Sequence, residues 1–454
     1  MVFSVAAVMF NRGGVAAQQK AGRTVTFNRD VAPIFYRNCV SCHRPEEIGP
    51  MSLVTYKDAR PWARAIREKV VAREMPPWHA DPQVGEFSND ARLSEQEIAT
   101  IAAWVEQGAK EGERKDLPPA RQFTAGWRIG KPDVIIEMPE EFQLSASGPD
   151  EYHYFTVPTN FKEDVWVQAA ELLPGNRRIV HHAHADVRAA TTQAGPDQTA
   201  RLKKASLWQS HFVRTGRLQF IKPDEPIIND GCGSPDGGYP LGGDFGPQME
   251  WSRLTSYLPG GSPETYPAGA AKLIPAGASI VINVHYSRAT GKPERDRTRL
   301  GLILAKQPPP FQVKSTLISN FLFSVPPGAE HHEVMACHTL KQELRAISYT
   351  AHMHFRGKDM KFDAVYPDGR RATIFSVPNY SFAWQRTYQL KQPVTLPKGT
   401  RLIITAHFDN SSRNKFNPNP AQAVRWGEPS ESEMMDGWID YIVDIKPPAK
   451  AAAQ

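Results

Sequence analysis

The sequence of 454 residues contains no apolar run of the eighteen or more residues that a membrane-spanning helix needs. It also contains no run of basic residues, and its net charge of +6 is spread thinly over the chain. Only four cysteines occur, which is too few for a disulfide-stabilised scaffold. We therefore expect a globular chain of about three domains, with no membrane span and no nucleic-acid partner.

Glycine, proline and histidine are plentiful, with 32, 39 and 14 residues respectively. Many turns favour short strands over a helical bundle, and from Asp133 onward short β-rich runs alternate with Gly/Pro turns. The sequence predicts two antiparallel β-sandwiches, 133–306 and 307–446, with a break near the prolines at 308–310. A helical domain at 24–110, with a capping box at Ser94 and Glu97, and a charged, Pro-rich linker at 111–132 precede them.

The N-terminal segment 1–23 has an apolar stretch at 2–10 and small residues at Val15, Ala16 and Ala17. This pattern is typical of a signal peptide that lacks its basic start. A disordered N-terminus is the alternative interpretation.

The helical domain carries Cys39-Val-Ser-Cys42-His43, the attachment signature of a c-type haem. The two thiols bond to the haem vinyl groups, and His43 is placed to bind the iron. A redox dithiol or half of a zinc site are the alternatives, but no second cysteine pair exists to complete a zinc tetrahedron. Covalent haem attachment normally takes place outside the cytoplasm, so we expect a periplasmic or secreted protein.

A second axial haem ligand is expected after the motif. Met75, in Arg-Glu-Met-Pro-Pro-Trp, is the first candidate, because prolines beside it would fix the loop that presents its thioether. His79 is the second candidate, and simple core packing of Met75 is the third interpretation. Residues 24–110 as a whole resemble a small class I cytochrome c domain.

Histidines recur in the predicted strands, as His181-His182-Ala-His184, as His285 and as His352-Met-His354. Residues two apart in a strand project from one face, so His352 and His354 are able to chelate one ion. Neighbours point to opposite faces, so His181 and His182 share a metal only at a bulge or a strand end. The pair His182 and His184 is the geometric rival.

Four motifs in this order, Val-His181-His182, Val-His285-Tyr, His352-Met-His354 and Glu433-Met434, resemble those of the copper type II monooxygenases. That family contains peptidylglycine α-hydroxylating monooxygenase and dopamine β-monooxygenase, and here the resemblance spans about residues 125 to 445, fused to a cytochrome c. It implies two jelly-roll sandwiches, each with one copper, facing one another across an open cleft.

Carried onto this chain, the resemblance implies an electron-transfer copper on His181, His182 and His285. It implies a dioxygen-binding copper on His352, His354 and Met434, where a soft thioether favours Cu(I). The expected reaction is hydroxylation of a C–H bond of a small organic substrate by O2. The expected cofactors are two copper ions and haem c, with electrons from ascorbate or a redox protein entering through the haem.

In the peptide-hydroxylating members of that family, three positions bind the peptide carboxylate. This sequence has different residues at all three. These positions are Thr350, Asp436 and Trp438 in this chain, so a carboxylate clamp is missing and an Asp would repel an anion. We predict that glycine-extended peptides are not substrates. Trp438 and Phe355 either line an apolar pocket or belong to the core.

Several features leave alternatives open. A non-catalytic copper and haem electron-transfer protein is the main alternative function, and a binding sandwich with incidental histidines is another. Cys232 and Cys337 fall in different predicted domains, and the sequence does not decide whether they are paired. Three further histidines are interpreted as surface or loop residues without metal; they are His331, His332 and His338.

Overall fold

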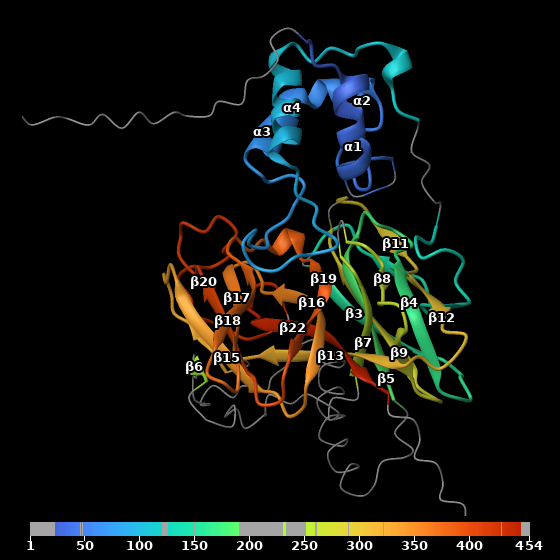
Figure 1. Ribbon diagram of the computed structural model, residues 1–454, viewed down its shortest axis with the longest axis vertical. Helices are drawn as coiled ribbons and strands as arrows, with labels where there is room; N and C mark the ends of the chain where they lie inside the picture. The colour runs from blue at the N-terminus through green and yellow to red at the C-terminus, as the bar shows by residue number, and fades with distance from the viewer. Residues whose placement is uncertain are drawn as a thin grey trace, which may run out of the picture.

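The computed structural model describes residues 23–45, 47, 49–119, 126–148, 150–189, 230–232, 251–258, 261–288, 290–320, 322–427 and 429–445. The predicted signal segment lies almost wholly outside these residues. Strands dominate the described chain after the first helices (Figure 1), which confirms a mainly β protein with a small helical N-terminal module. No helix in the described part is both long and apolar enough to cross a membrane.

The helical module is built around an aromatic core. Its last long helix, α4, begins with the predicted capping box of Ser94 and Glu97. Trp104 of α4 is fully buried and packs against the rings of Phe27 and Phe35. The helices are η1 (Phe27–Val31), α1 (Ala32–Asn38), α2 (Tyr56–Ala59), η2 (Arg60–Trp62), α3 (Ala63–Val71), α4 (Glu95–Glu106) and η3 (Arg114–Asp116).

The first β core lies between two sheets. The four-stranded sheet has the order β3 (Glu151–Pro158), β10 (Ser279–Tyr286), β5 (Val180–Arg188) and β7 (Trp251–Tyr257). The facing strands are β1 (Val134–Glu137), β12 (Arg299–Leu304), β4 (Val165–Leu173) and β9 (Ala270–Ile274), with β8 (Glu264–Thr265) beside β4. A small ribbon joins β2 (Phe142–Leu144) to β11 (Glu294–Asp296). β10 is buried along nearly its whole length, as a central strand should be.

The second β core also lies between two sheets. One contains β13 (Phe311–Ser319), β22 (Asp436–Asp444), β16 (Leu344–His352) and β19 (Thr387–Leu396). The other contains β18 (Arg371–Val377), β17 (Gly357–Val365), β20 (Arg401–Phe408), β15 (His332–Thr339) and the short β6 (Asp230–Gly231). A ribbon of β14 (Ser324–Val325) and β21 (Val424–Arg425), and the turn η5 (Phe382–Trp384), complete it. Alternate residues of β20 are buried, which is the period-2 pattern of a half-buried strand. The jelly-roll connectivity stays a prediction.

One sheet runs through both β cores. β9 pairs in parallel with β13 at Ala270–Phe311 and Ala271–Gln312, so the strand order is continuous from β1 to β19. Lys272 of β9, only 1 % exposed, donates to the Arg253 carbonyl at 2.5 Å. The same ammonium group donates to Ser315 of β13 at 3.3 Å and lies 3.8 Å from the Asp440 carboxylate of β22, so the two sandwiches are joined by backbone pairing and by a buried side chain.

The two cysteines outside the haem motif form a disulfide. β6 pairs in parallel with β15, which brings Cys232 beside Cys337 with their Cα atoms 5.1 Å apart. Residues 230–232 thus lie at the edge of the second core, although the sequence places them within the first sandwich. The pairing that the sequence left open is settled.

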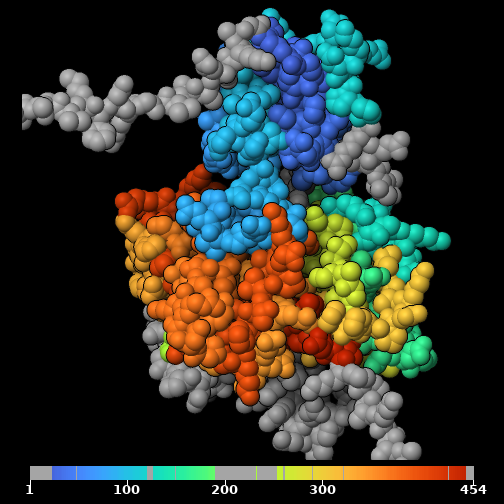
Figure 2. Space-filling model, viewed as in Figure 1, coloured from blue at the N-terminus to red at the C-terminus, as the bar shows by residue number. Residues whose placement is uncertain are grey.

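The loop between α3 and α4 connects the helical module to the second β core. Trp78 and Phe87 are buried in that core, where Trp78 packs edge-on against Tyr388 at 4.9 Å between ring centroids. Backbone bonds from Lys391 to Glu86 and from Ser88 to Gln389 extend the contact along β19. The space-filling view shows the light-blue loop seated on the orange strands (Figure 2). The sequence predicted that Trp78 and Phe87 belong to the helical domain, but both side chains are buried in the second β core.

Candidate metal centres and haem attachment site

The cysteine motif follows directly on α1. The N–H groups of Cys42 and His43 donate to the Cys39 carbonyl at 3.1 and 2.9 Å, so the thiols and the imidazole share one turn. His43 Nδ1 donates to the Met51 carbonyl at 3.2 Å, and burial lowers the His43 pKa. A neutral ring protonated at Nδ1 leaves Nε2 as a free lone pair, which an axial iron ligand requires. A Cβ at Gly49 would lie 2.7 Å from the Cys42 carbonyl, so this turn needs glycine.

The two candidates for the other axial position lie apart. Met75 is half-buried at the start of the α3–α4 loop, and its N–H donates to the Lys69 carbonyl at 3.2 Å. The His79 ring is bonded to the Asn379 carbonyl in the second β core. Met75 stays our predicted ligand, and His79, whose Nε2 has no hydrogen-bond partner among the described residues, stays the second candidate.

The three histidines expected to share the first copper come together on β5 and β10. His285 pairs with His182, but the next residue of β10, Tyr286, pairs with Val180, so His181 is the extra residue of a β-bulge. The three Nδ1 atoms converge, at 3.2 Å for His181 to His182, 3.3 Å for His181 to His285 and 3.4 Å for His182 to His285. Neighbouring residues of a regular strand point to opposite faces, so this bulge is what allows His181 and His182 to point toward one metal position.

These separations fit a single metal ion. Three nitrogens bound at about 2.0 Å to one ion lie about 3.3 to 3.5 Å apart in tetrahedral or trigonal geometry. Burial and the charge of His285 lower the pKa of His181 to about 4, so its ring is neutral. The Asp150 carboxylate lies 3.0 Å from His285 Nε2 and accepts a hydrogen bond from it, which leaves Nδ1 of that ring as the lone pair.

The rival ligand His184 takes another partner. Its Nδ1 lies 2.8 Å from the Ser256 hydroxyl on β7, although its ring is only 5.3 Å from that of His182. Among the described residues, the histidine cluster able to hold an ion on these strands comprises His181, His182 and His285.

The second pair of histidines stands at the end of β16. His352 Nδ1 lies 2.8 Å from the Gln385 side-chain oxygen, and His354 Nδ1 lies 3.1 Å from the Ser432 carbonyl. Both Nδ1 atoms therefore donate, and both Nε2 lone pairs are left for a metal. Burial lowers the pKa of His352 to about 4, and the rings are 5.2 Å apart. Met434 lies half-buried two residues before Asp436, the first residue of β22, which pairs with His352.

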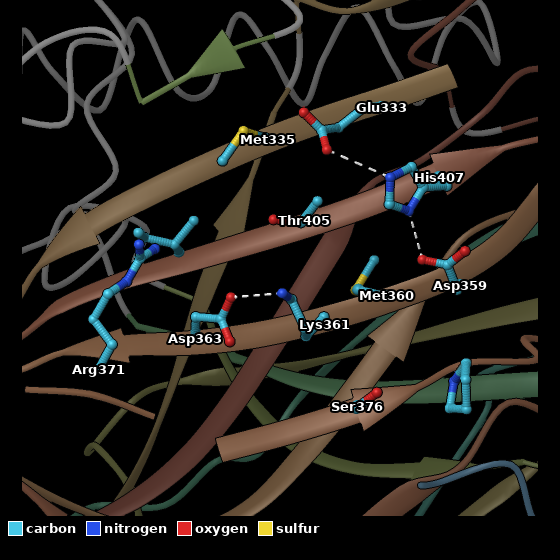
Figure 3. A pocket seen from close by; sticks show the side chains of 12 residues that line it. Glu333, Met335, Asp359, Met360, Lys361, Asp363, Arg371, Ser376, Thr405 and His407 are labelled. Atoms are coloured by element: carbon cyan, nitrogen blue, oxygen red, sulfur yellow. Dashed lines mark hydrogen bonds and ion pairs between the residues drawn. The ribbon is translucent and has the colours of Figure 1, made fainter. Parts of the chain in front are cut away.

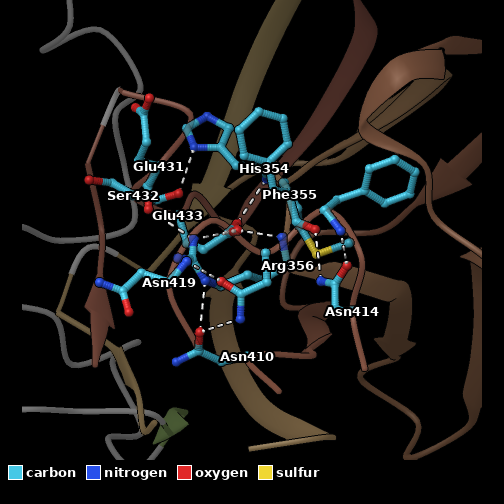
Figure 4. A network of polar contacts seen from close by, with 12 residues as sticks. His354, Phe355, Arg356, Asn410, Asn414, Asn419, Glu431, Ser432 and Glu433 are labelled. Carbon is cyan, nitrogen blue, oxygen red and sulfur yellow. Dashed lines mark hydrogen bonds and ion pairs between the residues drawn. The ribbon is translucent and has the colours of Figure 1, made fainter. Parts of the chain in front are cut away.

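A buried carboxylate fixes the backbone around this second pair (Figure 4). Glu433, fully buried, accepts from the N–H groups of His354 at 2.8 Å and Arg356 at 2.7 Å. The Arg356 guanidinium lies 3.8 Å from the same carboxylate and also donates to Asn410 at 2.8 Å. Burial raises the pKa of Glu433 to about 8, even though these donors favour the ionised form. Sequence reasoning found Glu433 only as a neighbour of Met434.

One aromatic ring lies between the two histidine sets. Phe382 of η5 has its ring centroid 5.8 Å from that of His181 and 5.7 Å from that of His354. Tyr152 stacks on His285 at 4.2 Å, and its hydroxyl reaches Ser430 of the second sandwich at 2.7 Å. The two sets therefore face each other across the junction of the sandwiches.

The side chains at the three positions that differ from the peptide-binding pattern all contact other residues of the protein. Thr350 bonds to Thr387 at 3.1 Å, and Asp436 accepts from Ser319 at 2.6 Å. Burial raises the pKa of Asp436 to about 6. Trp438 packs under a guanidinium from the first sandwich, that of Arg253, at 4.4 Å. This arginine was not predicted from the sequence, because it lies far from Trp438 along the chain.

A third cluster of polar groups lies on the outer face of the second sandwich, beside a hollow of about 470 Å³ (Figure 3). His407 bonds to Asp359 at 2.6 Å and faces Glu333 at 3.4 Å, and His331 stacks on it at 3.9 Å. Both nitrogens of His407 thus have carboxylate partners. The ligand atoms of His331, Asp359 and His407 lie within 4.8 Å of one another, so this group is also able to hold a metal ion, which the sequence did not predict for His331.

Comparison with known proteins gives two family matches. Residues 316–447 match the copper type II ascorbate-dependent monooxygenase C-terminal domain, and residues 29–109 match cytochrome c. No curated protein matches the sequence. An uncharacterized protein of Listeria monocytogenes EGD-e is 14% identical over 37% of this chain and 14% of its own, with a TM-score of 0.13, which carries no argument about fold.

Proposed function

With residues 316–447 identified as a copper type II ascorbate-dependent monooxygenase C-terminal domain and residues 29–109 as a cytochrome c domain, we propose that the chain is a haem-containing, copper-dependent monooxygenase. It would use O2 to hydroxylate a C–H bond of a small organic substrate. The observation that carries the proposal is the pair of histidine sets facing each other at the sandwich junction. In the first set the Nδ1 atoms of His181, His182 and His285 converge, and in the second set the Nδ1 atoms of His352 and His354 are hydrogen-bonded, which leaves their Nε2 atoms for a metal.

The first copper would be held by Nδ1 of His181, His182 and His285. The second would be held by Nε2 of His352 and His354 with the Met434 thioether. Copper at these sites supplies one-electron transfer and O2 binding, and a methionine ligand favours the reduced ion.

The other groups around the sites hold the ligands in place. Asp150 selects the tautomer of His285, and Gln385 selects that of His352. Glu433 clamps the backbone on both sides of His354 and Arg356. Phe382 fills the space between the two sets with an apolar ring, which limits water there.

The haem would be bound by Cys39, Cys42 and His43, with Met75 as the second axial ligand. The Nδ1 bond from His43 to Met51 supports this assignment, because it leaves Nε2 free for the iron. Electrons from ascorbate or a redox protein would reach the copper sites through this haem. Stopped-flow mixing of reduced haem with oxidised copper tests the route, since haem oxidation should accompany copper reduction; copper that stays oxidised while the haem stays reduced would exclude it.

Two neighbouring methionines allow a sharp test of the second copper. Met434→Leu should abolish O2 consumption while the haem spectrum and the three-histidine copper remain. Met435, fully buried in the second β core, provides the control, and Met435→Leu should keep O2 consumption. Full activity in Met434→Leu would remove the site assignment.

Measuring O2 consumption also distinguishes a catalytic monooxygenase from a non-catalytic electron-transfer protein. Copper-loaded protein with a reductant and a panel of small substrates should consume O2 and form hydroxylated products detectable by mass spectrometry. Copper that is reduced and reoxidised without any product would favour the non-catalytic electron-transfer alternative.

We also propose a periplasmic or secreted location and exclude glycine-extended peptides as substrates. The Cys232–Cys337 disulfide supports the first, because disulfides persist in oxidising compartments. The internal contacts of Thr350, Asp436 and Trp438 support the second, because these side chains do not form a carboxylate clamp. Hydroxylation of a glycine-extended peptide by the copper-loaded protein would contradict it.

A further inference from the structure

The helical module meets both β sandwiches close to the haem attachment loop. Glu47, four residues after His43, forms an ion pair with Arg177 of the first sandwich. Asn89 of the α3–α4 loop donates to the Thr387 carbonyl at 2.8 Å. The residue before Thr387 is Arg386, which is close enough to Cys42 for the two to interact electrostatically.

Three nitrogen atoms at this junction are buried without a hydrogen-bond partner among the described residues. They are Trp78 Nε1, His79 Nε2 and Arg386 Nε. Trp78 and Arg386 are donors only, so each requires an acceptor. A buried donor left unpaired costs about 1 to 3 kcal/mol, and two such donors close to one another indicate a missing acceptor group.

Arg386 also lacks an acidic partner in the described chain. The groups that raise its pKa are Tyr388 and Cys42, neither of them a carboxylate, and burial lowers the pKa instead. The positive charge of Arg386 also contributes to lowering the pKa of His79 after burial, so the two side chains are neighbours. The junction therefore holds a partly buried cation, Arg386, near Cys42 of the haem motif, and the indole N–H of Trp78, next along the chain to the neighbouring His79, without an acceptor.

A c-type haem carries two propionate carboxylates, which are strong acceptors for guanidinium and indole N–H groups. We propose that Arg386 of the second sandwich, with Trp78 of the α3–α4 loop, binds a carboxylate of the haem, so that the copper-binding domain completes the haem site. This inference rests on the proposed haem of the preceding section. It makes the haem pocket a property of the whole chain and not of the helical module alone.

The position of Arg386 gives this contact a consequence for the copper sites. The preceding residue, Gln385, is buried and bonds to His352 at 2.8 Å. Gln385 also donates to the carbonyl of Phe382, the ring between the two histidine sets, at 3.2 Å. Residues 382–386 thus connect the haem-facing junction to both candidate copper sites within one short segment.

The test uses full-length, haem-loaded and copper-free protein and measures the haem midpoint potential by redox titration. A buried positive charge beside the haem favours the ferrous state, so Arg386→Gln should lower the potential. Arg386→Lys keeps the charge and should restore most of the shift. Trp78→Phe keeps the ring in the core and removes only the N–H donor, so it should lower the potential less.

Arg371→Gln is the matched control, because Arg371 is an exposed arginine on the outer face of the same sandwich. The haem midpoint potential of this variant should equal that of the wild type. Equal potentials for folded Arg386→Gln and wild type, or equal shifts in Arg386→Gln and Arg371→Gln, would overturn the inference. Because no copper is present, a failed hydroxylase assay leaves this result untouched. Purified protein without haem would overturn both the proposed haem and its contact.

Discussion

Replacing Glu433 with alanine should destabilise the second sandwich and weaken the copper site that it supports. The carboxylate accepts from the N–H groups of His354, Arg356 and Met434, and it lies 3.8 Å from the Arg356 guanidinium. Alanine removes every acceptor at once, in a place where the side chain is fully buried.

The size of the effect follows from those contacts. Each buried N–H left without an acceptor costs about 1 to 3 kcal/mol, although water entering the new space recovers part of this. Three N–H groups lose their acceptor together, so the expected fall in the free energy of unfolding for Glu433→Ala is about 3 to 5 kcal/mol after water recovers part of the loss. Glu433→Gln fills the same volume and keeps one oxygen acceptor, so we expect it to lose about 1 to 3 kcal/mol. Against a domain stability of about 5 to 15 kcal/mol, both losses are measurable.

Urea unfolding of the copper-free variants, followed by tryptophan fluorescence, measures these losses. Glu431→Ala is the control, because Glu431 lies two residues away and its side chain is exposed. Its hydrogen bond to Arg356, at 2.8 Å, comes from its backbone carbonyl, which alanine keeps. Copper titration gives a second readout, since removing a group that orients a ligand typically lowers metal affinity about 10- to 100-fold. The reasoning is refuted if Glu433→Ala unfolds at the wild-type urea concentration, or if Glu431→Ala loses as much.

Three further predictions concern the rest of the fold. Partial burial raises the pKa of Glu97, but hydrogen bonds from Ser94 and other donors outweigh this and hold it below its ordinary value, so its stabilisation is present above about pH 4. It is lost as pH falls through the lowered pKa, and Glu97→Gln should flatten the acid unfolding of the helical module in circular dichroism; an unchanged acid limb would contradict this. Cys337→Ser removes the cross-link to Cys232, which spans a sequence separation of 105. Thermal melts should show a loss of about 2 to 5 kcal/mol in the free energy of unfolding. A reductant should produce the same loss in the wild type and no further loss in the variant. Trp78→Ala should cost about 3 to 5 kcal/mol and expose the α3–α4 loop to limited proteolysis; an uncut loop would argue against its docking on the second core.

Local signals carried much of the sequence prediction. The haem motif, the capping box at Ser94 and the spacing of His352 and His354 are all contained within a few residues. The requirement for a bulge at His181 also follows from strand geometry alone, because neighbours in a regular strand face opposite ways. The family matches confirm the fusion of a cytochrome c domain to a copper monooxygenase domain.

The groups that orient the predicted ligands were not predictable in this way. Asp150, Gln385 and Glu433 reach their partners from other strands or loops, and Arg253 comes from the opposite sandwich. Such contacts depend on the register of strands far apart in the sequence, which a single sequence does not specify. The docking of Trp78 was missed for the same reason, since its apolar side chain also suits a helical core.

The shared sheet makes the arrangement of the copper sites a fixed property of the fold. His182 and His285 lie on the first sandwich and His352 on the second, so a hinge between the sandwiches would change the distance between the two sets. The parallel pairing of β9 with β13 opposes such a hinge, and so does Lys272, which is buried and spans from the Arg253 carbonyl to Ser315 and Asp440. Opening the junction would leave that ammonium group buried without its partners, which costs about 3 to 5 kcal/mol. If the two sites hold copper as proposed, electron transfer between them would therefore proceed across the separation that Phe382 occupies, and not through closure of the two sandwiches.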